Sequence, residues 1–262
     1  MHQYYKSLEL KVNFYMTIQT CFKKPNPSLW EKLNWHPSSR QLEQFLTVQR
    51  LLNHYNAEVN LTRLIHGEDY WIGQIFDSLW PLQTELNHQP EKLTCIDVGT
   101  GCGFPGLAIA IGLTKASITL VDSTKKKTRI LKEISRELGL ESRINVLTER
   151  IESTGQNKNY RGTYDLAIAR AVADAPVVAE YLIPLINQSG EALLFKGNWC
   201  QIDSQNLTKT LENLNASIAE IQSIKLPSNR GKRHLIRLKA QGPCPLFYPR
   251  SIGIPAKKPL GL

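Results

Sequence analysis

The sequence predicts an α/β fold with a seven-stranded, mostly parallel sheet, and three observations lead to it. A buried strand at 93–98 runs into a glycine-rich turn and then into a helix start. From residue 93 onward, apolar runs rich in β-branched residues alternate with amphipathic helical stretches, as in sheets covered by helices on both faces. Two further strands, at 217–226 and 234–239, flank a turn sequence and predict a terminal strand pair.

The 262 residues divide into four expected segments, enough for one sizeable α/β domain with an appendage. Residues 1–28 are a leader that ends in a proline-containing linker, and the sequence does not predict an ordered structure for them. Residues 29–90 form an N-terminal helical subdomain. Residues 91–240 form the domain that contains the sheet. Residues 241–262 are a basic tail with five prolines, which excludes a regular helix.

The helical subdomain has two predicted helices. Ser38 or Ser39 caps the first, which runs through about Tyr55. The second spans about 68–79, and the polar run 60–63 connects the two. One interpretation is a small packed subdomain. The other is a cap over the ligand site that helps to bind substrate.

Within the sheet domain, polar residues follow several strands at their carboxyl ends, where ligands of open parallel sheets bind. The predicted strands lie at 93–98, 117–121, 144–147, 164–169 and 190–195, and the intervening helices at about 107–113, 125–138, 174–186 and 202–214. The residues at or near the strand ends are Asp97, Asp122, Glu152, Arg170 and Lys196. Their convergence predicts a site at this edge.

The glycine-rich turn predicts a nucleotide site, because free backbone N–H groups in such turns bind ligands. Two cofactors compete for it. Gly101, Gly103 and Gly106 satisfy the short dinucleotide pattern, which is weak alone. In the longer pattern Asp97-x-Gly99-x-Gly101-x-Gly103, the carboxylate would repel a pyrophosphate and suits a cationic cofactor such as S-adenosylmethionine (SAM).

Asp122 follows Gly103 by 19 residues, where an acid accepts hydrogen bonds from ribose hydroxyls. Both candidate cofactors carry that ribose, so Asp122 does not choose between them. Lys125, Lys126 and Lys127 then crowd the start of a helix, against the preference of the helix dipole. They form either a solvated surface or a phosphate contact beside the site.

The net charge of +9 is concentrated at the C-terminal end. Residues 221–262 contain nine Lys or Arg and no acid, which leaves 23 basic and 23 acidic residues in 1–220. A solvated basic face would explain this, but we favour a nucleic-acid partner. The tail is then either a flexible end or an arm that follows RNA or folds back near the site. The predicted RNA contacts are Arg63, Lys125, Lys126, Arg230, Lys232, Arg233, Arg250, Lys257 and Lys258.

The five cysteines are scattered, and no pair has metal-ligand or redox spacing, so we expect reduced thiols and no metal site. No apolar run is long enough for a membrane span, and no signal peptide is evident. These features predict a cytoplasmic protein without membrane contact, and a monomer is the default expectation.

Residues 97–106 resemble the D-V-G-T-G-x-G-F/L-P-G loop of the RsmG (GidB) family. The resemblance covers about residue 30 to the end. Further matching runs are 60–62, Asp77-Ser78, 120–123, 150–152, 169–171, 195–197, 233–235, and the tail from 248 to 260. Where this family often has a histidine, three residues before Asp77, this chain has Gln74.

The resemblance implies a class I SAM-dependent methyltransferase, Rossmann-like, that methylates N7 of one guanine in 16S ribosomal RNA, so the expected partner is this RNA or the small ribosomal subunit. The SAM contacts that it implies, together with the other loop residues, are Asp97, Gly99, Gly101, Gly103, Phe104, Asp122, Ser123, Thr124, Ile151, Glu152 and Arg170.

The chemistry agrees with N7 methylation, because N7 has a free lone pair and needs no general base. Ala169-Arg170-Ala171-Val172 lacks the Asn/Asp-Pro-Pro-aromatic motif of exocyclic-amine methyltransferases. Arg170 is a candidate catalytic or positioning residue that would bind guanine O6, a phosphate or the SAM carboxylate, and Lys196 is a second candidate with the same roles. For both residues, the alternative is a structural ion pair at a strand end. Two alternatives stay open: an NAD-dependent oxidoreductase, and a non-enzymatic protein of RNA binding or ribosome assembly.

Overall fold

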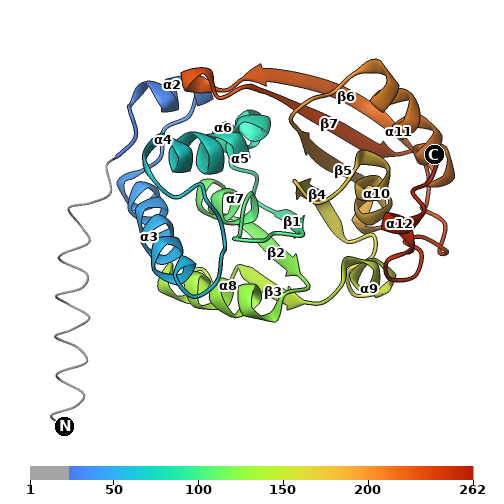
Figure 1. The fold of residues 1–262 in the computed structure, drawn as a ribbon, viewed down its shortest axis with the longest axis horizontal. Coiled ribbons are helices and arrows are strands. Elements are labelled where there is room, and N and C mark those ends of the chain that lie inside the picture. Colours follow the sequence, from blue (N-terminus) through green and yellow to red (C-terminus); the bar gives the residue numbers. More distant parts are fainter. Residues whose placement is uncertain (1–23, 262) are drawn as a thin grey trace, which may run out of the picture.

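The computed structural model describes residues 24–261, so most of the predicted leader lies outside the described residues. It confirms the predicted fold class: one seven-stranded sheet in the order β3-β2-β1-β4-β5-β7-β6, with helices on both faces (Figure 1). The strands are β1 (Leu93–Val98), β2 (Ala116–Asp122), β3 (Ile144–Thr148), β4 (Tyr164–Arg170), β5 (Ile186–Lys196), β6 (Ala216–Lys225) and β7 (Lys232–Ala240).

The first five strands pair in parallel, and the predicted terminal pair completes the sheet in antiparallel fashion. β7 lies between β5 and β6, and its apolar residues Leu235, Ile236 and Leu238 are buried. β6 forms the edge and has no fully buried residue. β5 begins at Ile186, earlier than predicted, because residues 183–185 form a short 3₁₀ turn that leads directly into it.

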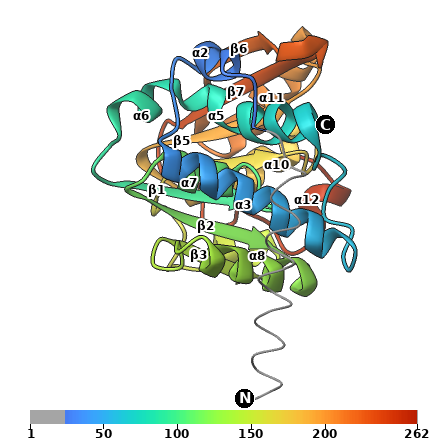
Figure 2. The ribbon, with the colours of Figure 1, turned by 90° about the vertical axis from the view of Figure 1, so that its left-hand side faces the viewer.

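The helices that follow the strands lie on opposite faces of the sheet. α7 (Gly106–Gly112) and α8 (Lys125–Glu137) lie on the face that the N-terminal helices also cover (Figures 1 and 2). The other face is covered by α9 (Ile151–Gln156), α10 (Ala175–Leu182) and α11 (Gln201–Asn213). None of the helices formed within residues 24–261 combines the length and apolar character that a membrane span needs.

The N-terminal segment is helical, as its pattern predicts. Ser38 caps α3 through a reciprocal pair of hydrogen bonds with Gln41, which fixes the start of that helix. The predicted second helix is interrupted: residues 71–76 are π-helical, a conformation often found at functional sites. The remaining helices here are α2 (Ser28–Leu33), α3 (Ser39–Asn56), α4 (Gly67–Tyr70), α5 (Asp77–Leu79), a 3₁₀ turn at 80–82, and α6 (Gln83–His88).

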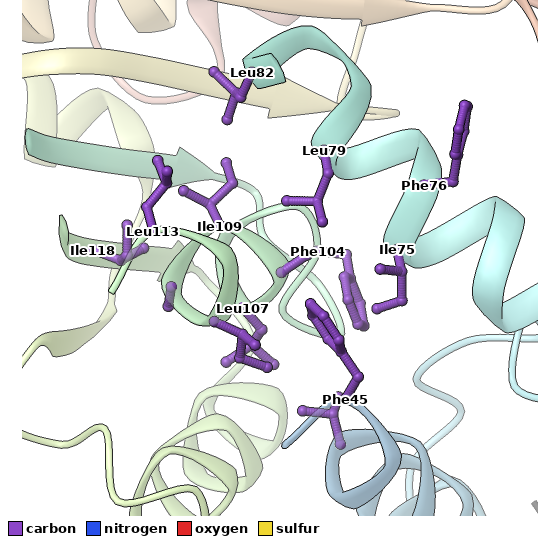
Figure 3. Packing of buried hydrophobic residues seen from close by; sticks show 14 of the residues in the cluster. Phe45, Ile75, Phe76, Leu79, Leu82, Phe104, Leu107, Ile109, Leu113 and Ile118 are labelled. Atoms are coloured by element: carbon purple, nitrogen blue, oxygen red, sulfur yellow. The ribbon is translucent and has the colours of Figure 1, made fainter. Parts of the chain in front are cut away.

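The N-terminal helices share one hydrophobic core with α7 and α8. Phe45 of α3 packs with Phe104 and Leu107 from the glycine-rich turn and α7, and Leu79 closes the same cluster from above (Figure 3). Phe104 also meets Tyr70 edge-on, with ring centroids 6.1 Å apart. The packing therefore fixes the helical segment against the turn that precedes α7.

In the structure, the tail folds back along the α9–α10 face and contacts both helices. It contains a single helical turn, α12 (Ile254–Lys257). The first residues of the tail are held by the Arg161 guanidinium, which donates hydrogen bonds to the carbonyl oxygens of Cys244 at 2.9 Å and Pro245 at 3.0 Å. Gln156 donates to the carbonyl oxygen of Pro249 at 2.7 Å.

Candidate active site

Two neighbouring cavities lie at the carboxyl ends of the parallel strands. The larger has a volume of about 520 Å³, and the smaller about 250 Å³. Both are lined by Gly99 and Asp122, so they meet above the ends of β1 and β2. This is the edge that the sequence predicts for the site.

Asp97 lies beneath the glycine-rich turn and lines neither cavity. Its Oδ2 accepts hydrogen bonds from Thr100 Oγ1 at 2.7 Å and from the Gly106 N–H at 2.8 Å. Its Oδ1 is buried and accepts no hydrogen bond from any residue within 24–261. Burial raises the pKa of Asp97 from 3.8 to about 6, although both hydrogen bonds oppose the shift. The carboxylate thus holds the two ends of the turn together.

We expect Asp97→Asn to remove one pH-dependent part of the stability. Because the folded state binds this proton more tightly, the contribution is complete below about pH 3.8 and is lost as the pH rises through about 6. The free energy of unfolding of the native protein, minus that of the variant, should fall by about 3 kcal/mol across this range. Urea unfolding at pH 4 and pH 7 measures it, and a constant difference would contradict the shift.

Gly99 must be a glycine because its φ is +66° and an added Cβ would lie 2.7 Å from Cγ2 of Val172. Gly101 and Phe104 line the larger cavity. Gly103 lines neither cavity, and its N–H donates to the Thr100 carbonyl oxygen at 2.9 Å inside the turn.

Asp122 is the acidic residue that faces both cavities. Its Oδ2 accepts from the Gly101 N–H at 3.0 Å and its Oδ1 from the Thr124 N–H at 2.8 Å. Each carboxylate oxygen has a second lone pair, so Asp122 can also accept ribose hydroxyls. Ser123 lines the smaller cavity, whereas Thr124 lines neither and acts through this hydrogen bond.

The smaller cavity has apolar walls suited to a flat aromatic base. Ile151 and Val172 line it, together with the Tyr181 side chain from α10. Glu152 lies just below the surface, 2% exposed, and its Oε1 accepts from the Gly253 N–H at 2.9 Å and from Tyr181 Oη at 3.3 Å. Burial alone would raise the pKa of Glu152, but the Gly253 N–H and other donors outweigh it and lower the pKa. Its Oε2 accepts no hydrogen bond from the part of the chain that the structure describes, and it remains a buried acceptor.

Arg170, the last residue of β4, lines the larger cavity and forms hydrogen bonds to the π-helical segment. Its guanidinium donates to the Gly73 carbonyl oxygen at 3.0 Å, to Asp77 Oδ2 at 3.3 Å and to Gln74 Oε1. Asp77 is buried, and Arg233 donates to the same Oδ2 at 3.3 Å. Asp77 Oδ1 accepts no hydrogen bond from the described residues. The resulting ionic cluster joins the helical segment, β4 and β7 at the mouth of the larger cavity.

Lys196 also lines the larger cavity, at the end of β5. Its Nζ donates to the Ala173 carbonyl oxygen at 2.6 Å, and burial lowers its pKa. Cys102 faces the same cavity, but burial raises the pKa of its thiol, which keeps it protonated.

The predicted RNA contacts divide into exposed and ion-paired side chains. Arg230 pairs with Asp69, Arg233 with Asp77, and Arg250 with Glu180. With Arg237 and Lys239, five of the nine cations in 221–262 make ion pairs, so the charge count overstates the free positive charge there. The exposed members of the predicted set are Arg63, Lys125, Lys126, Lys232, Lys257 and Lys258.

Sequence reasoning missed several residues of the site. Asp77 was noted only as part of a resemblance, although it is the shared acceptor of two arginines. By contrast, Lys127 belongs to the lysine cluster for which the sequence predicts a solvated surface or a phosphate contact beside the site, and it lines the larger cavity. Tyr181 and Ala256 line the smaller cavity, and no local pattern distinguishes them from ordinary helix residues.

Comparison with known proteins gives consistent results. A family model described as "GidB: rRNA small subunit methyltransferase G" matches residues 40–236. A "Ribosomal RNA small subunit methyltransferase G" from Prochlorococcus marinus (strain MIT 9303) is 56% identical over 94% of this chain and all of its own length. One from Synechococcus sp. (strain WH7803) is 51% identical over 94% of this chain and 97% of its own length.

Among solved structures, an O-methyltransferase from Bacillus cereus in complex with SAH matches with a TM-score of 0.52 and 15% identity. The match covers 74% of this chain and 90% of that chain. At this identity it supports the fold alone.

Proposed function

Because this chain belongs to the GidB family of small-subunit ribosomal RNA methyltransferases, we propose that it transfers a methyl group from SAM to N7 of a guanine in 16S ribosomal RNA. The observation that carries the proposal is the pair of cavities that meet at Gly99 and Asp122. The smaller cavity combines an acidic acceptor with apolar residues, as an adenosine requires. The larger cavity has room for a base beside it. Family membership argues against the NAD-dependent oxidoreductase.

The smaller cavity fits the adenosine of SAM. Asp122 would accept the ribose hydroxyls, and Ile151 and Val172 would contact the adenine faces. The unpartnered Glu152 Oε2 is an acceptor near the cavity, which suits the exocyclic amine of adenine. The N–H groups of the glycine-rich turn would hold the methionine end, with Asp97 acting through the turn that it fixes.

The larger cavity would receive the guanine, flipped out of its RNA stack. When bound, SAM supplies an electrophilic methyl group on a sulfonium. The guanine N7 lone pair forms the new N–C bond as the S–C bond breaks, and SAH leaves. No proton moves, so the work of the chain is to position the base and exclude water. We propose that Arg170 holds the π-helical segment, which lines the larger cavity, in place through its hydrogen bond to Gly73. Lys196 would hold the adjoining segment 171–173 through its hydrogen bond to Ala173.

The helical segment 29–90 is proposed as a cap over the substrate. Gly73, Gln74 and Asp77 line the larger cavity together with strand-end residues of the sheet domain. We also propose that the protein acts as a monomer. The substrate would be the 16S RNA, alone or within the small subunit.

The direct test is transfer of labelled methyl from SAM to undermethylated small subunits and to their extracted RNA. We expect label at one guanine N7, located by mass mapping, in at least one of these substrates. Failure to modify either would overturn the proposal and favour the non-enzymatic alternative. SAM binding without NAD binding would exclude the oxidoreductase independently.

We expect Lys125→Ala combined with Lys126→Ala to weaken RNA binding and to reduce its salt dependence. Both side chains are exposed at the N-terminus of α8, beside Lys127 in the larger cavity. Each lost phosphate contact should lower the slope of log K against log salt by about 0.7 to 0.9. Filter binding at several salt concentrations measures this. Lys115→Ala, which removes a lysine paired with Glu91, serves as control. An unchanged slope would remove this surface from the RNA contact.

A further inference from the structure

The described part of the tail, residues 241–261, lies beyond the family-model match, which ends at residue 236. Its course is nevertheless fixed by contacts with α9 and α10. Pro249 packs so closely on Gly155 of α9 that a Cβ there would lie 2.7 Å from the proline Cγ. The hydrogen bonds from Arg161 and Gln156 hold the same stretch. The tail therefore packs beside α9 and α10, where Figure 1 shows it.

The strongest anchor of the tail is an ion pair between Arg250 and Glu180 of α10. Arg250 Nε donates to Glu180 Oε1 at 2.9 Å, and Nη2 donates to Oε2 at 2.6 Å. The backbone N–H of Arg250 also donates to Oε1 at 2.8 Å. Glu180 is fully buried, so these donors supply its charge compensation. A bidentate pair of this kind fixes orientation as well as distance.

The anchored stretch leads directly to the smaller cavity. Arg250 Nη2 also donates to the Lys258 carbonyl oxygen at 2.7 Å, so one guanidinium holds both sides of α12. Between them, the Gly253 N–H donates to Glu152 at 2.9 Å, and Ala256 lines the cavity. Arg250 therefore connects the buried Glu180 to a wall of the cavity without lining that cavity.

We infer that the tail forms one wall of the cofactor cavity, with Arg250 and Glu180 as the residues that position it. The inference rests on the proposed function, because it takes the smaller cavity as the adenosine site. It gives Arg250 a role other than RNA contact, since its guanidinium is occupied by Glu180 and Lys258. When the tail detaches from α9 and α10, Glu152 loses its hydrogen bond from the Gly253 N–H, and the cavity loses the wall that contains Ala256.

The effect on cofactor affinity follows from the fraction of molecules in which the tail is packed against α9 and α10. The apparent Kd equals the intrinsic Kd divided by that fraction. If Arg250→Ala leaves the tail seated in about one tenth of the molecules, the Kd for SAH rises about tenfold. Arg250→Lys keeps a positive charge near Glu180 but loses the bidentate contact of the guanidinium. Its affinity for SAH should therefore lie between those of the native protein and Arg250→Ala.

The test is calorimetric titration of full-length variants with SAH, in the absence of RNA. Besides the Arg250 variants, Ala256→Trp places a bulky side chain at the cavity wall. Lys257→Trp, at the next residue, which does not line the cavity, is its matched control. We expect the Kd to rise about tenfold or more for Arg250→Ala and Ala256→Trp, and to stay unchanged for Lys257→Trp. In methyl transfer, KM for SAM should rise while kcat at saturating SAM is retained.

The outcomes separate this inference from the proposed function. If the native protein does not bind SAH, the proposed cofactor site fails. If it binds SAH and the Arg250→Ala and Ala256→Trp variants bind equally well, the tail is not a wall of the site. If Arg250→Ala fails to fold because Glu180 is left uncompensated, Ala256→Trp against Lys257→Trp still decides the question.

Discussion

Replacing Asp122 by alanine should raise the Kd for SAH at least about 100-fold, the largest loss of affinity that we expect from a single side chain. Asp122 faces both cavities and is the acidic acceptor available to the ribose hydroxyls. A hydrogen bond to a charged group contributes about 1.5–3 kcal/mol, and 1.4 kcal/mol corresponds to a factor of ten. The variant also releases the N–H groups of Gly101 and Thr124. Titration calorimetry measures the change.

Asp174→Ala is the matched control for that experiment. Asp174 is also an aspartate just beyond a strand end, but it is exposed and lines neither cavity. Its removal should leave the Kd unchanged. Equal affinity of the Asp122→Ala and native proteins would exclude Asp122 from the ribose site.

Arg170→Ala should lower the free energy of unfolding by about 3 kcal/mol. Removing one partner of a buried ion pair leaves the other charge uncompensated. Here the remaining charge is Asp77, which would keep only the more exposed Arg233 as its cationic partner among the described residues, and whose Oδ1 accepts no hydrogen bond from them. The Gly73 carbonyl oxygen would lose its donor as well. Urea unfolding measures the loss, and we expect methyl transfer to fall with it.

Two further variants separate the structural and functional parts of this effect. Arg233→Ala removes the other arginine bound to Asp77 and is the matched control, with a smaller expected loss because Arg233 is more exposed. Arg170→Gln combined with Asp77→Asn removes both charges and should recover most of the stability. If that double variant folds and transfers methyl at the native rate, Arg170 has no role in positioning the substrate.

Much of the fold could be predicted because its signals are local. Parallel strands buried on both faces read as apolar runs, and Ser38 marks the start of α3 by its own hydrogen bonds. The π-helical segment could not be predicted, because a shift of backbone hydrogen bonds by one residue leaves the apolar pattern of residues 71–76 nearly unchanged. That shift forms the part of the helix that Arg170 contacts.

The site was predictable in its location but not in every role. Asp97 has the position expected of a ligand contact, yet it lies under the turn and binds Thr100 and Gly106. Charge counting assigned Arg250 to RNA because its acidic partner, Glu180, is 70 residues away in the sequence. Pairings of this kind depend on tertiary packing, which a single sequence does not reveal.

The position of β7 has a consequence for synthesis on the ribosome. β5 emerges before β6, but the strand that pairs with β5 is β7, which is made last. Until residue 240 has emerged, the nascent chain exposes a long, apolar edge on β5, and β6 has no neighbour to join. Such an open edge favours pairing with other chains. The nascent protein therefore depends on its last strand for protection from aggregation.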